Sequence, residues 1–523
     1  MNTVYSHLVR AGLLCGALAA SSAYAVTPSQ VTAANRLYIS GATATDNALA
    51  TLFLRTGNVD APPVCKAGTI DVYTDTAAPV TGSKQKAILC TLNQAVGGIA
   101  ANTNVAFLKE SNGGSNEGTQ VIARGVARTF LNIANDAAPN CTTTTTQAAG
   151  SITSYPNHQA FTLHSVCSGL DTAAKPDVGI ADVNPALFNI GLTPISTAEV
   201  NRLQSDSLYQ PSFGVAVSLN LYRALQSLQS KTVTSDTAAD MPSLTSAQVR
   251  GLITGNIFSW DQITGPTGTP LASKPVFICR RGDDSGTQAS FASYFLNERC
   301  VNGGPNFVTA TNTASQQSGS TWNFATFGTD PVFAGAGSGD VRNCLDGHND
   351  HDNFAVGILG TESRYDALGS AGGSTNAAAG TQEFRYVKLD GRTPNLESVA
   401  NGVYDFVEEN VMNRLNTAFN GQNPPSGNKA ALANYVRDSF GNLDVISTLV
   451  VSQSHGLTGG LAPALGAGVT PNAIPVSAAQ VVANPVSPYT KSLNGPVFDC
   501  GPATTIAPTL APVTTTNFNG AAQ

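Results

Sequence analysis

The sequence predicts an α/β fold built on parallel sheets, and two observations lead to this prediction. Short apolar segments typical of strands alternate with segments of helical periodicity, which is the order that produces parallel strands joined by helices. The chain also has 523 residues, 42% of them hydrophobic, which is enough for one large domain or two ordinary ones with proper cores. We therefore expect two α/β segments, one beginning near residue 36 and the other near residue 213.

The first α/β segment lies between residues 35 and 182. Its predicted elements are, in order, a strand over 36–43, a helix over 45–55, a strand and loop over 104–118 and a helix over 119–134. Both strands end in loops rich in Gly, Ser and Thr, and open α/β sheets bind ligands at such corners. A threonine run between Cys141 and Cys167 breaks the pattern, so we expect residues 135–176 to form a disulfide-tied surface insertion.

The second α/β segment follows the same alternation. Its predicted elements are a strand and a helix over 213–228, a helix over 245–263 with Thr245 or Ser246 as N-cap, a strand over 275–281, a helix over 289–300 and a strand over 354–360. Helical periodicity returns over 396–415 and 429–447. Beyond about residue 452 the chain is a poorly patterned tail of Gly, Pro, Ala and Thr.

The N-terminal residues predict export. His7 and Arg10 precede an apolar run, and an Ala-Tyr-Ala cleavage site ends at Ala25, so we expect a signal peptide over 1–25. The residue before the cysteine of this segment is a leucine rather than a small residue, which argues against a lipoprotein. The mature chain is therefore expected to be periplasmic or secreted.

The composition excludes two classes of protein. Removal of Arg10 with the signal peptide lowers Lys and Arg from 27 to 26 against 34 Asp and Glu, and the resulting net charge of −8 excludes a nucleic-acid-binding protein. No second apolar stretch approaches the roughly 18 residues of a membrane span. The stretch over 443–451 stops at nine residues. We expect no direct membrane insertion.

Eight of the nine cysteines remain after cleavage, an even number that suits disulfides in an oxidising compartment. No C-x-x-C pair occurs, which argues against metal ligation. Pairing of sequence neighbours predicts Cys65 with Cys90, Cys141 with Cys167 and Cys279 with Cys300, and it leaves Cys344 for Cys500. The sequence alone does not prove this connectivity.

Two loops of the first segment have the composition of an oxyanion site. In one, Gly41 lets the backbone approach a ligand, and Thr43 offers a hydroxyl before a helix whose first N–H groups are unpaired. The other repeats this design ahead of the next helix, with Ser111, Gly113, Gly114 and Ser115. An ordinary glycine turn with a helix cap is the alternative for each loop, but two such corners on parallel strands can face one ligand.

A third loop, over 280–291, concentrates charge in a chain of which only 12% is charged. Arg281 can make a bidentate bond to a tetrahedral anion, and Asp283 can hold that guanidinium in place. The loop ends in a hydroxyl, a bare amide and a second hydroxyl at a helix start, supplied by Ser285, Gly286 and Thr287. A surface turn with an Arg–Asp pair is the alternative, and it leaves these last three residues unexplained.

At this loop the sequence resembles the periplasmic phosphate-binding proteins of ABC transporters. Residues 281–287 fit the family's R-x-D-x-S-G-T loop, and residues 41–43 and 113–118 resemble its first and second phosphate loops. Three further segments are similar to the family in the same order, namely 176–185, 244–263 and 354–360. The resemblance covers residues 36–415. The insertion, the disulfides and the tail depart from the family, as does the lack of an aromatic residue and a proline after Thr43.

The resemblance implies a two-lobed fold of the type II periplasmic-binding-protein class, in which each lobe is a mostly parallel sheet flanked by helices and hinge strands join the lobes. It assigns residues 36–209 and 361–450 to the first lobe and 210–360 to the second, followed by a tail over 451–523. The chain crossings are expected near residues 210 and 360.

The resemblance also implies a set of phosphate ligands: Thr43, the amide of Ala44, Ser115, Asp182, Arg281, Asp283, Ser285, Gly286 and Thr287, with Ser111 in reserve. HPO4 2- still carries a proton that Asp182 can accept, whereas sulfate would set lone pair against lone pair. Asp182 is therefore the predicted discriminator between the two anions. A helix N-cap is the alternative role for Asp182.

An exported phosphate receptor follows from this resemblance, with inorganic phosphate as ligand and an ABC transporter permease as partner. We expect a monomer without catalytic residues, metal or cofactor. Two alternatives are an exported phosphatase-like enzyme on the same fold and a surface or adhesive protein with a relic anion site. The His- and Asp-rich stretch over 346–352 lacks the spacing of a calcium or zinc site, so we predict a polar surface turn there.

Overall fold

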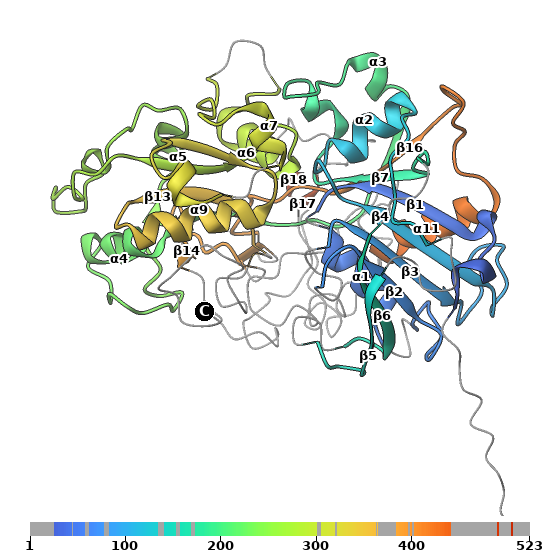
Figure 1. Cartoon of the computed structure of the whole chain (residues 1–523). Coiled ribbons are helices and arrows are strands. Elements are labelled where there is room, and N and C mark those ends of the chain that lie inside the picture. Colours follow the sequence, from blue (N-terminus) through green and yellow to red (C-terminus); the bar gives the residue numbers. More distant parts are fainter. Residues whose placement is uncertain are drawn as a thin grey trace, which may run out of the picture.

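The computed structural model describes two α/β lobes (Figure 1). The described residues are 26–43, 45–57, 62–77, 83–133, 141–152, 157–168, 173–300, 305–319, 322–361, 363, 383–395, 398–399, 402–440, 489–490 and 504–505. The predicted signal peptide, Ala44, Cys500 and nearly all of the predicted tail lie outside this part of the chain.

A nine-stranded sheet with the strand order β5-β6-β2-β3-β4-β1-β7-β16-β8 forms the first lobe (Figure 1). Its strands are β1 (Arg36–Gly41), β2 (Asp71–Thr74), β3 (Gln85–Thr91), β4 (Asn104–Glu110), β5 (Cys141–Gln147), β6 (Phe161–Cys167), β7 (Val178–Ala181), β8 (Leu203–Ser207) and β16 (Val411–Leu415). Because β1 pairs in parallel with both β4 and β7, the carboxyl ends of these three strands meet at one edge.

The side chains of β1 alternate between the two faces of this sheet, as the two-residue period of a strand requires. Leu37 and Ile39 pack in a core with the helices α1 (Asp46–Leu54) and α11 (Gly427–Phe440), whereas Tyr38 joins a separate cluster. The helix α2 (Glu117–Arg124) contacts β7 and β16.

Three glycines bring the start of α2 close to the strands. A Cβ atom on Gly118 would lie 2.1 Å from the carbonyl oxygen of Ile180, and one on Gly179 would lie 2.1 Å from the carbonyl oxygen of Gly118. A Cβ atom on Gly41, whose φ is +107°, would lie 2.5 Å from Gly118 Cα. The first turn of α2 therefore reaches the carboxyl ends of β1 and β7 because no side chain separates them.

A five-stranded sheet with the order β12-β11-β13-β9-β14 forms the second lobe. Its strands are β9 (Phe213–Ser218), β11 (Phe277–Arg281), β12 (Val332–Gly335), β13 (Ala355–Gly360) and β14 (Phe384–Tyr386). The helices of this lobe are α4 (Leu219–Leu228), α5 (Ser246–Ile253), α6 (Gly286–Leu296), α7 (Ala314–Gly319), α8 (Phe324–Phe327) and α9 (Ser338–Asp350).

The remaining elements are short. They are β10 (Ser243–Leu244), β15 (Lys388–Leu389), β17 (Tyr489–Thr490), β18 (Thr504–Thr505), α3 (Thr197–Val200) and the 3-10 helices η1 (Pro28–Gln30), η2 (Ala33–Asn35), η3 (Pro185–Phe188) and η4 (Trp260–Gln262). β10 pairs in parallel with β15, and β17 pairs with β18. No helix in the described part of the chain is long and apolar enough to cross a membrane.

The predicted fold class is confirmed, but both sheets are mixed rather than mostly parallel. β2 with β3, β3 with β4 and β5 with β6 are antiparallel, and the two strands of each pair follow one another in the chain. The assignment of residues 361–450 to the first lobe is wrong at β14, which pairs with β9 of the second sheet.

Three predicted helices differ from the structure. The helix predicted over 245–263 begins after Thr245 as predicted but ends at Ile253, and only the 3-10 helix η4 follows within that range. The helix predicted over 119–134 ends at Arg124, because Gly125 adopts the left-handed conformation that terminates helices. The helix predicted over 396–415 is wrong from residue 402 on, because residues 402–410 contain no helix and β16, which follows them, lies between β7 and β8 and pairs with both. Buried side chains line β16 on both faces, so tertiary pairing prevails over the helical periodicity there.

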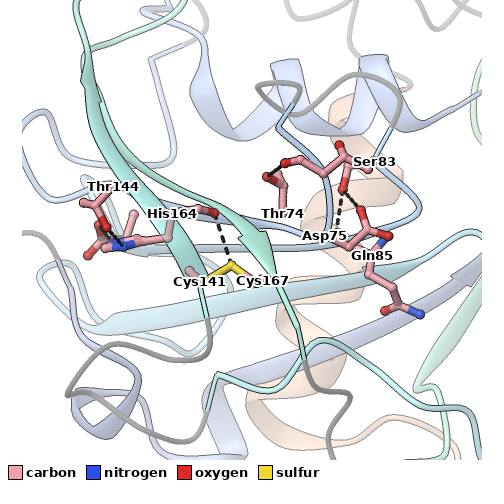
Figure 2. The surroundings of a disulfide bond; sticks show 10 residues. Thr74, Asp75, Ser83, Gln85, Cys141, Thr144, His164 and Cys167 are labelled. Atoms are coloured by element: carbon pink, nitrogen blue, oxygen red, sulfur yellow. Dashed lines mark hydrogen bonds and ion pairs between the residues drawn. A yellow bond between two sulfur atoms is a disulfide. The ribbon is translucent and has the colours of Figure 1, made fainter.

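The threonine-rich insertion is part of the first sheet. Its strands β5 and β6 form an antiparallel hairpin closed by the predicted disulfide between Cys141 and Cys167 (Figure 2). Thr144 Oγ1 lies 3.1 Å from His164 Nδ1 across the hairpin. Because β6 pairs with β2, this hairpin extends the sheet to one edge and leaves the threonines of β5 exposed.

The disulfides follow the prediction in the first lobe and depart from it in the second. Cys65 pairs with Cys90, as predicted. Cys279 pairs with Cys344 because α9 packs on β11, so the predicted pairs Cys279 with Cys300 and Cys344 with Cys500 are wrong. Cys300 also takes part in a disulfide.

Residues 346–350 form the end of α9, and only residues 351–352 form the exposed turn that was predicted over the whole stretch 346–352. Asp346 and His348 are buried, and the His348 ring stacks on Phe277 with 4.3 Å between ring centroids. Burial lowers the pKa of His348 to about 4. His348 lies close to Cys279 and Cys344, whose sulfurs are joined in the disulfide.

Candidate functional site

Three helices begin directly after the loops singled out in the sequence: α1 after β1, α2 after β4 and α6 after β11. Their N-cap residues, Thr45, Asn116 and Ser285, make no side-chain cap hydrogen bond. Ser196 and Thr245, which precede α3 and α5, do cap their helices. The side-chain capping bond that the ordinary-cap alternative implied for the first two loops is therefore not made by the N-cap residues of α1 and α2.

Ser115 and Asp182 are paired at the carboxyl ends of the first-lobe strands. Ser115 Oγ donates a hydrogen bond of 2.8 Å to Asp182 Oδ2, and both side chains are buried. Asn184, not Asp182, accepts the capping hydrogen bond of η3. Asp182 therefore has no role as a helix cap, although that was the alternative reading of its sequence context.

Burial raises the pKa of the Asp182 carboxyl above its ordinary value. The hydrogen bond from Ser115 and the positive charge of Arg281 oppose this rise. The carboxylate is thus destabilised by loss of water and stabilised by two groups that also border the site.

The second lobe contacts this pair through Gly286, the first residue of α6. A Cβ atom at Gly286 would lie 2.5 Å from Ser115 Oγ and 2.8 Å from Asp182 Oδ2. Only glycine allows this approach, which brings the N-terminus of α6 against the carboxylate of the opposite lobe. The two lobes therefore meet at the residues that the sequence motif singled out.

Arg281 is buried beside the same contact and is held by the loop ahead of α9. Its Nη1 donates to Ser338 Oγ at 3.0 Å, and its Nη2 donates to the carbonyl oxygen of Ala336 at 2.8 Å. Asp283 does not hold this guanidinium as predicted, because it forms an ion pair of 2.7 Å with Arg280. Successive side chains of β11 point to opposite faces, which separates Arg281 from the partner of Arg280.

Two polar atoms of the site lack a partner. Asp182 Oδ1 and Ser285 Oγ are buried and make no hydrogen bond to any group in the described part of the chain. Each such atom costs about 1–3 kcal/mol if it stays unsatisfied. A ligand that donates a hydrogen bond to Asp182 and accepts one from Ser285 would satisfy both atoms.

The structure places the other predicted ligands at the start of α6, after β1 and in the loop after β4. Thr287 is buried in the first turn of α6, and Thr43 is half-buried just past the end of β1. Ser111, the reserve residue, is engaged elsewhere, because its hydroxyl donates to Asp46 Oδ1 at 2.8 Å. The structure thus brings together Ser115, Asp182, Arg281, Ser285, Gly286 and Thr287.

A buried ionic cluster behind the first two loops escaped the sequence analysis. Lys109 Nζ donates to the carbonyl oxygen of Gly41 at 2.7 Å and to Ser111 Oγ at 2.7 Å. Asp46 lies 3.4 Å from Lys109 Nζ and 3.1 Å from Lys86 Nζ. Burial lowers the pKa of Lys109. The one sequence feature that could have indicated this cluster is a lysine inside the apolar strand over 104–110.

Together these features define a two-lobed α/β protein with a buried polar site where the lobes meet. No protein-family model matches the chain, and no curated protein matches it either.

Solved structures do match the chain. It is similar to a putative phosphate ABC transporter substrate-binding protein with bound phosphate from Clostridium perfringens, with 13% identity over 54% of this chain and 79% of that one and a TM-score of 0.30. An ABC-type phosphate transport receptor from Vibrio cholerae matches with 13% identity over 53% and 79% of the two chains and a TM-score of 0.29. At such TM-scores these matches do not identify a ligand, which has to be argued from the residues of the site.

Proposed function

We propose that this chain is an exported phosphate-binding protein that holds HPO4 2- between its two lobes. The observation that carries the proposal is the pair of buried, unpartnered polar atoms, Asp182 Oδ1 and Ser285 Oγ, on either side of the lobe contact at Gly286. One is an acceptor and the other is a hydroxyl, which matches an anion that still carries one proton.

Each group of the site has a defined role in this proposal. Arg281 supplies the full positive charge, and the loop at Ser338 fixes its guanidinium for bidentate bonding. The first N–H groups of α6 and the hydroxyls of Ser285 and Thr287 donate to the remaining oxygens. Asp182 accepts the proton of HPO4 2-, and its unshared oxygen repels the fully ionised sulfate. Thr43 and Ala44 complete the set from the first loop.

The proposal is a receptor and not an enzyme. The groups assembled at the site suit binding and orienting an oxyanion, and in this proposal Asp182 accepts the hydrogen bond of the ligand's proton rather than acting as a base for Ser115. After export, the receptor would deliver phosphate to an ABC transporter permease or scavenge it. An adhesive surface protein with a relic anion site would not need two lobes that meet around a buried arginine.

Calorimetric titration of the mature, disulfide-intact protein tests the proposal, after unfolding and refolding to remove bound anion. We expect phosphate to bind and sulfate to compete poorly. Arg281→Ala should weaken phosphate binding at least about 100-fold, because two charge-assisted hydrogen bonds are lost. Arg250→Ala, which removes an exposed arginine of α5, is the matched control and should leave the affinity unchanged. Failure of phosphate to bind the refolded wild-type protein would reject the proposal.

A further inference from the structure

The lobes are joined beside the anion site by a segment of the first lobe, residues 187–193, which we call the latch segment. The carboxylate of Asp284, from the second lobe, accepts hydrogen bonds from the backbone N–H groups of Leu192 at 3.0 Å and Thr193 at 3.3 Å. It also accepts a bond of 2.7 Å from the Thr193 hydroxyl. A single carboxylate thus satisfies three donors of the opposite lobe.

Backbone and glycine geometry support the same contact. The carbonyl oxygen of Asp284 accepts a hydrogen bond of 3.1 Å from the N–H group of Asn116, whose side-chain amide donates to the carbonyl oxygen of Thr193 at 2.9 Å. At Gly191, φ is +137°, and a Cβ atom would lie 2.7 Å from Asp284 Oδ1. The latch segment can therefore approach this carboxylate closely only because residue 191 has no side chain.

Arg299 makes a second connection to the latch segment. Its Nη1 donates to the carbonyl oxygens of Leu187 at 2.7 Å and Ile190 at 3.1 Å, while its Nη2 donates to the carbonyl oxygen of Asp283 at 2.9 Å. Asn189 Nδ2 donates to the carbonyl oxygen of Arg299 at 2.9 Å. Arg299 is buried, so these bonds are shielded from water.

We propose that Asp284 and Arg299 are positioning residues that clasp the two lobes together beside the anion site, so that a bound anion is released slowly. The clasp uses neither Arg281 nor the paired Ser115 and Asp182, and it therefore stabilises closure independently of the ligand's own bonds. Opening of the lobes at this side has to break the bonds of Asp284 and of Arg299 together. The proposal rests on the proposed function for the bound anion and its release, but not for the clasp itself.

The consequence for the site is kinetic. Asp284 and Asp283 directly precede Ser285 and Gly286, so the bonds of the clasp also fix the start of α6 against Ser115 and Asp182. Removing the clasp should raise the dissociation rate constant much more than it changes the association rate constant, as is usual when buried contacts are lost. A clasped protein is suited to retain an anion, and delivery then requires a partner that opens the lobes.

Hydrogen–deuterium exchange of the anion-free protein tests the clasp without reference to phosphate. In the wild-type protein we expect slow exchange at the N–H groups of Leu192 and Thr193. Asp284→Ala should accelerate their exchange, Asp284→Asn should do so less, and Thr193→Val should have a smaller effect of the same direction. The matched control is Asp236→Ala, which removes a carboxylate paired with Arg223 and Arg385 inside the second lobe and should not alter these N–H groups.

Release of radiolabelled phosphate into excess unlabelled phosphate gives the second measurement. Release should be at least about tenfold faster from Asp284→Ala than from wild type. Arg299→Met should behave similarly. Unprotected Leu192 and Thr193 N–H groups in the anion-free wild-type protein, or an unchanged release rate in a folded Asp284→Ala variant, would overturn the clasp. If phosphate does not bind wild type at all, the proposed function fails, while the exchange result still decides the clasp.

Discussion

Asp182 is a buried carboxylate whose only hydrogen bonds in the described part of the chain involve Ser115. Its pKa is raised mainly by burial, so its charged form is less stable in the folded chain than in water. Glu199 is a useful contrast, because Arg124 lies 2.6 Å from its carboxylate and lowers its pKa to about 2. A buried carboxylate without such a cation is costly for stability and is retained where a ligand uses it.

Asp182→Asn should therefore stabilise the anion-free protein at neutral pH. A raised folded-state pKa means that ionisation destabilises the fold, and this effect grows as pH rises from the ordinary aspartate pKa to the raised value. The stabilisation should vanish in acid, where the native carboxyl is protonated. Glu199→Gln, which removes a carboxylate whose pKa is lowered by Arg124, should instead destabilise at neutral pH. Thermal unfolding at neutral and acidic pH measures both effects.

The same substitution should change selectivity, because an amide can donate a hydrogen bond to sulfate where a carboxylate repels it. The ratio of phosphate to sulfate affinity should fall at least about tenfold. Calorimetry with both anions gives the ratio. An unchanged ratio would show that Asp182 does not discriminate.

At this scale the sequence motif predicted the residues but not all of their contacts. Ser115, Arg281, Ser285 and Gly286 were identified because small hydroxyl residues, glycine and arginine at helix starts have recognisable chemistry, whereas Asp182 was assigned only through the family resemblance. The ion pair of Asp283 with Arg280 and the burial of Lys109 depend on the face of the sheet to which each strand side chain points. That direction is fixed only when the sheet is packed.

At the scale of elements, the disulfide between Cys279 and Cys344 joins β11 to α9. These elements end and begin, respectively, at Arg281 and Ser338, which are hydrogen-bonded to each other. The disulfide therefore cross-links the two elements whose ends hold the guanidinium of the proposed site. The disulfide between Cys141 and Cys167 instead closes the hairpin at the far edge of the first sheet (Figures 1 and 2).

Removing each disulfide should separate stability from binding. The double variant Cys279→Ala/Cys344→Ala should lose about 2–5 kcal/mol of unfolding free energy and should also bind phosphate more weakly, because β11 and α9 are no longer cross-linked. Cys141→Ala/Cys167→Ala is the control and should lose stability without losing affinity. Denaturant unfolding and calorimetry on both variants measure this. Equal losses of affinity in the two variants would contradict the assignment.

The elements also show which strands the sequence pattern predicts and which it does not. Strands flanked by apolar residues, such as β1, β9, β11 and β13, were predicted because their periodicity agrees with their final environment. β16 was not, since its identity as a strand comes from its two neighbours in the sheet, which lie about 200 residues earlier in the sequence. Pairing of Cys279 with Cys344 depends in the same way on the packing of α9 against β11.

For the whole molecule, the α/β class and the two segments followed from alternation of strands and helices, whereas the strand order and the return of β14 to the second sheet did not. Net charge is the remaining whole-molecule property that bears on function. The chain carries −7 at pH 7, which opposes the approach of an anion at long range. Binding in the proposed site must then depend on short-range groups, namely Arg281, the N–H groups at the start of α6 and the hydroxyls of Ser285 and Thr287.

Because binding would depend on short-range groups and not on the net charge, we predict that phosphate affinity depends only weakly on salt concentration. Exposed charges are screened beyond a Debye length of about 10 Å at 0.1 M, whereas buried bonds are screened much less. The dissociation constant of phosphate should therefore change less than about threefold between roughly 0.02 M and 0.5 M sodium chloride, and any small change at low salt should be towards weaker binding because the unscreened net charge repels the anion. Calorimetry across this range measures it. If salt instead weakened binding about tenfold or more, exposed cations would have to be attracting the anion, and the buried site between the lobes would not be its main source of affinity.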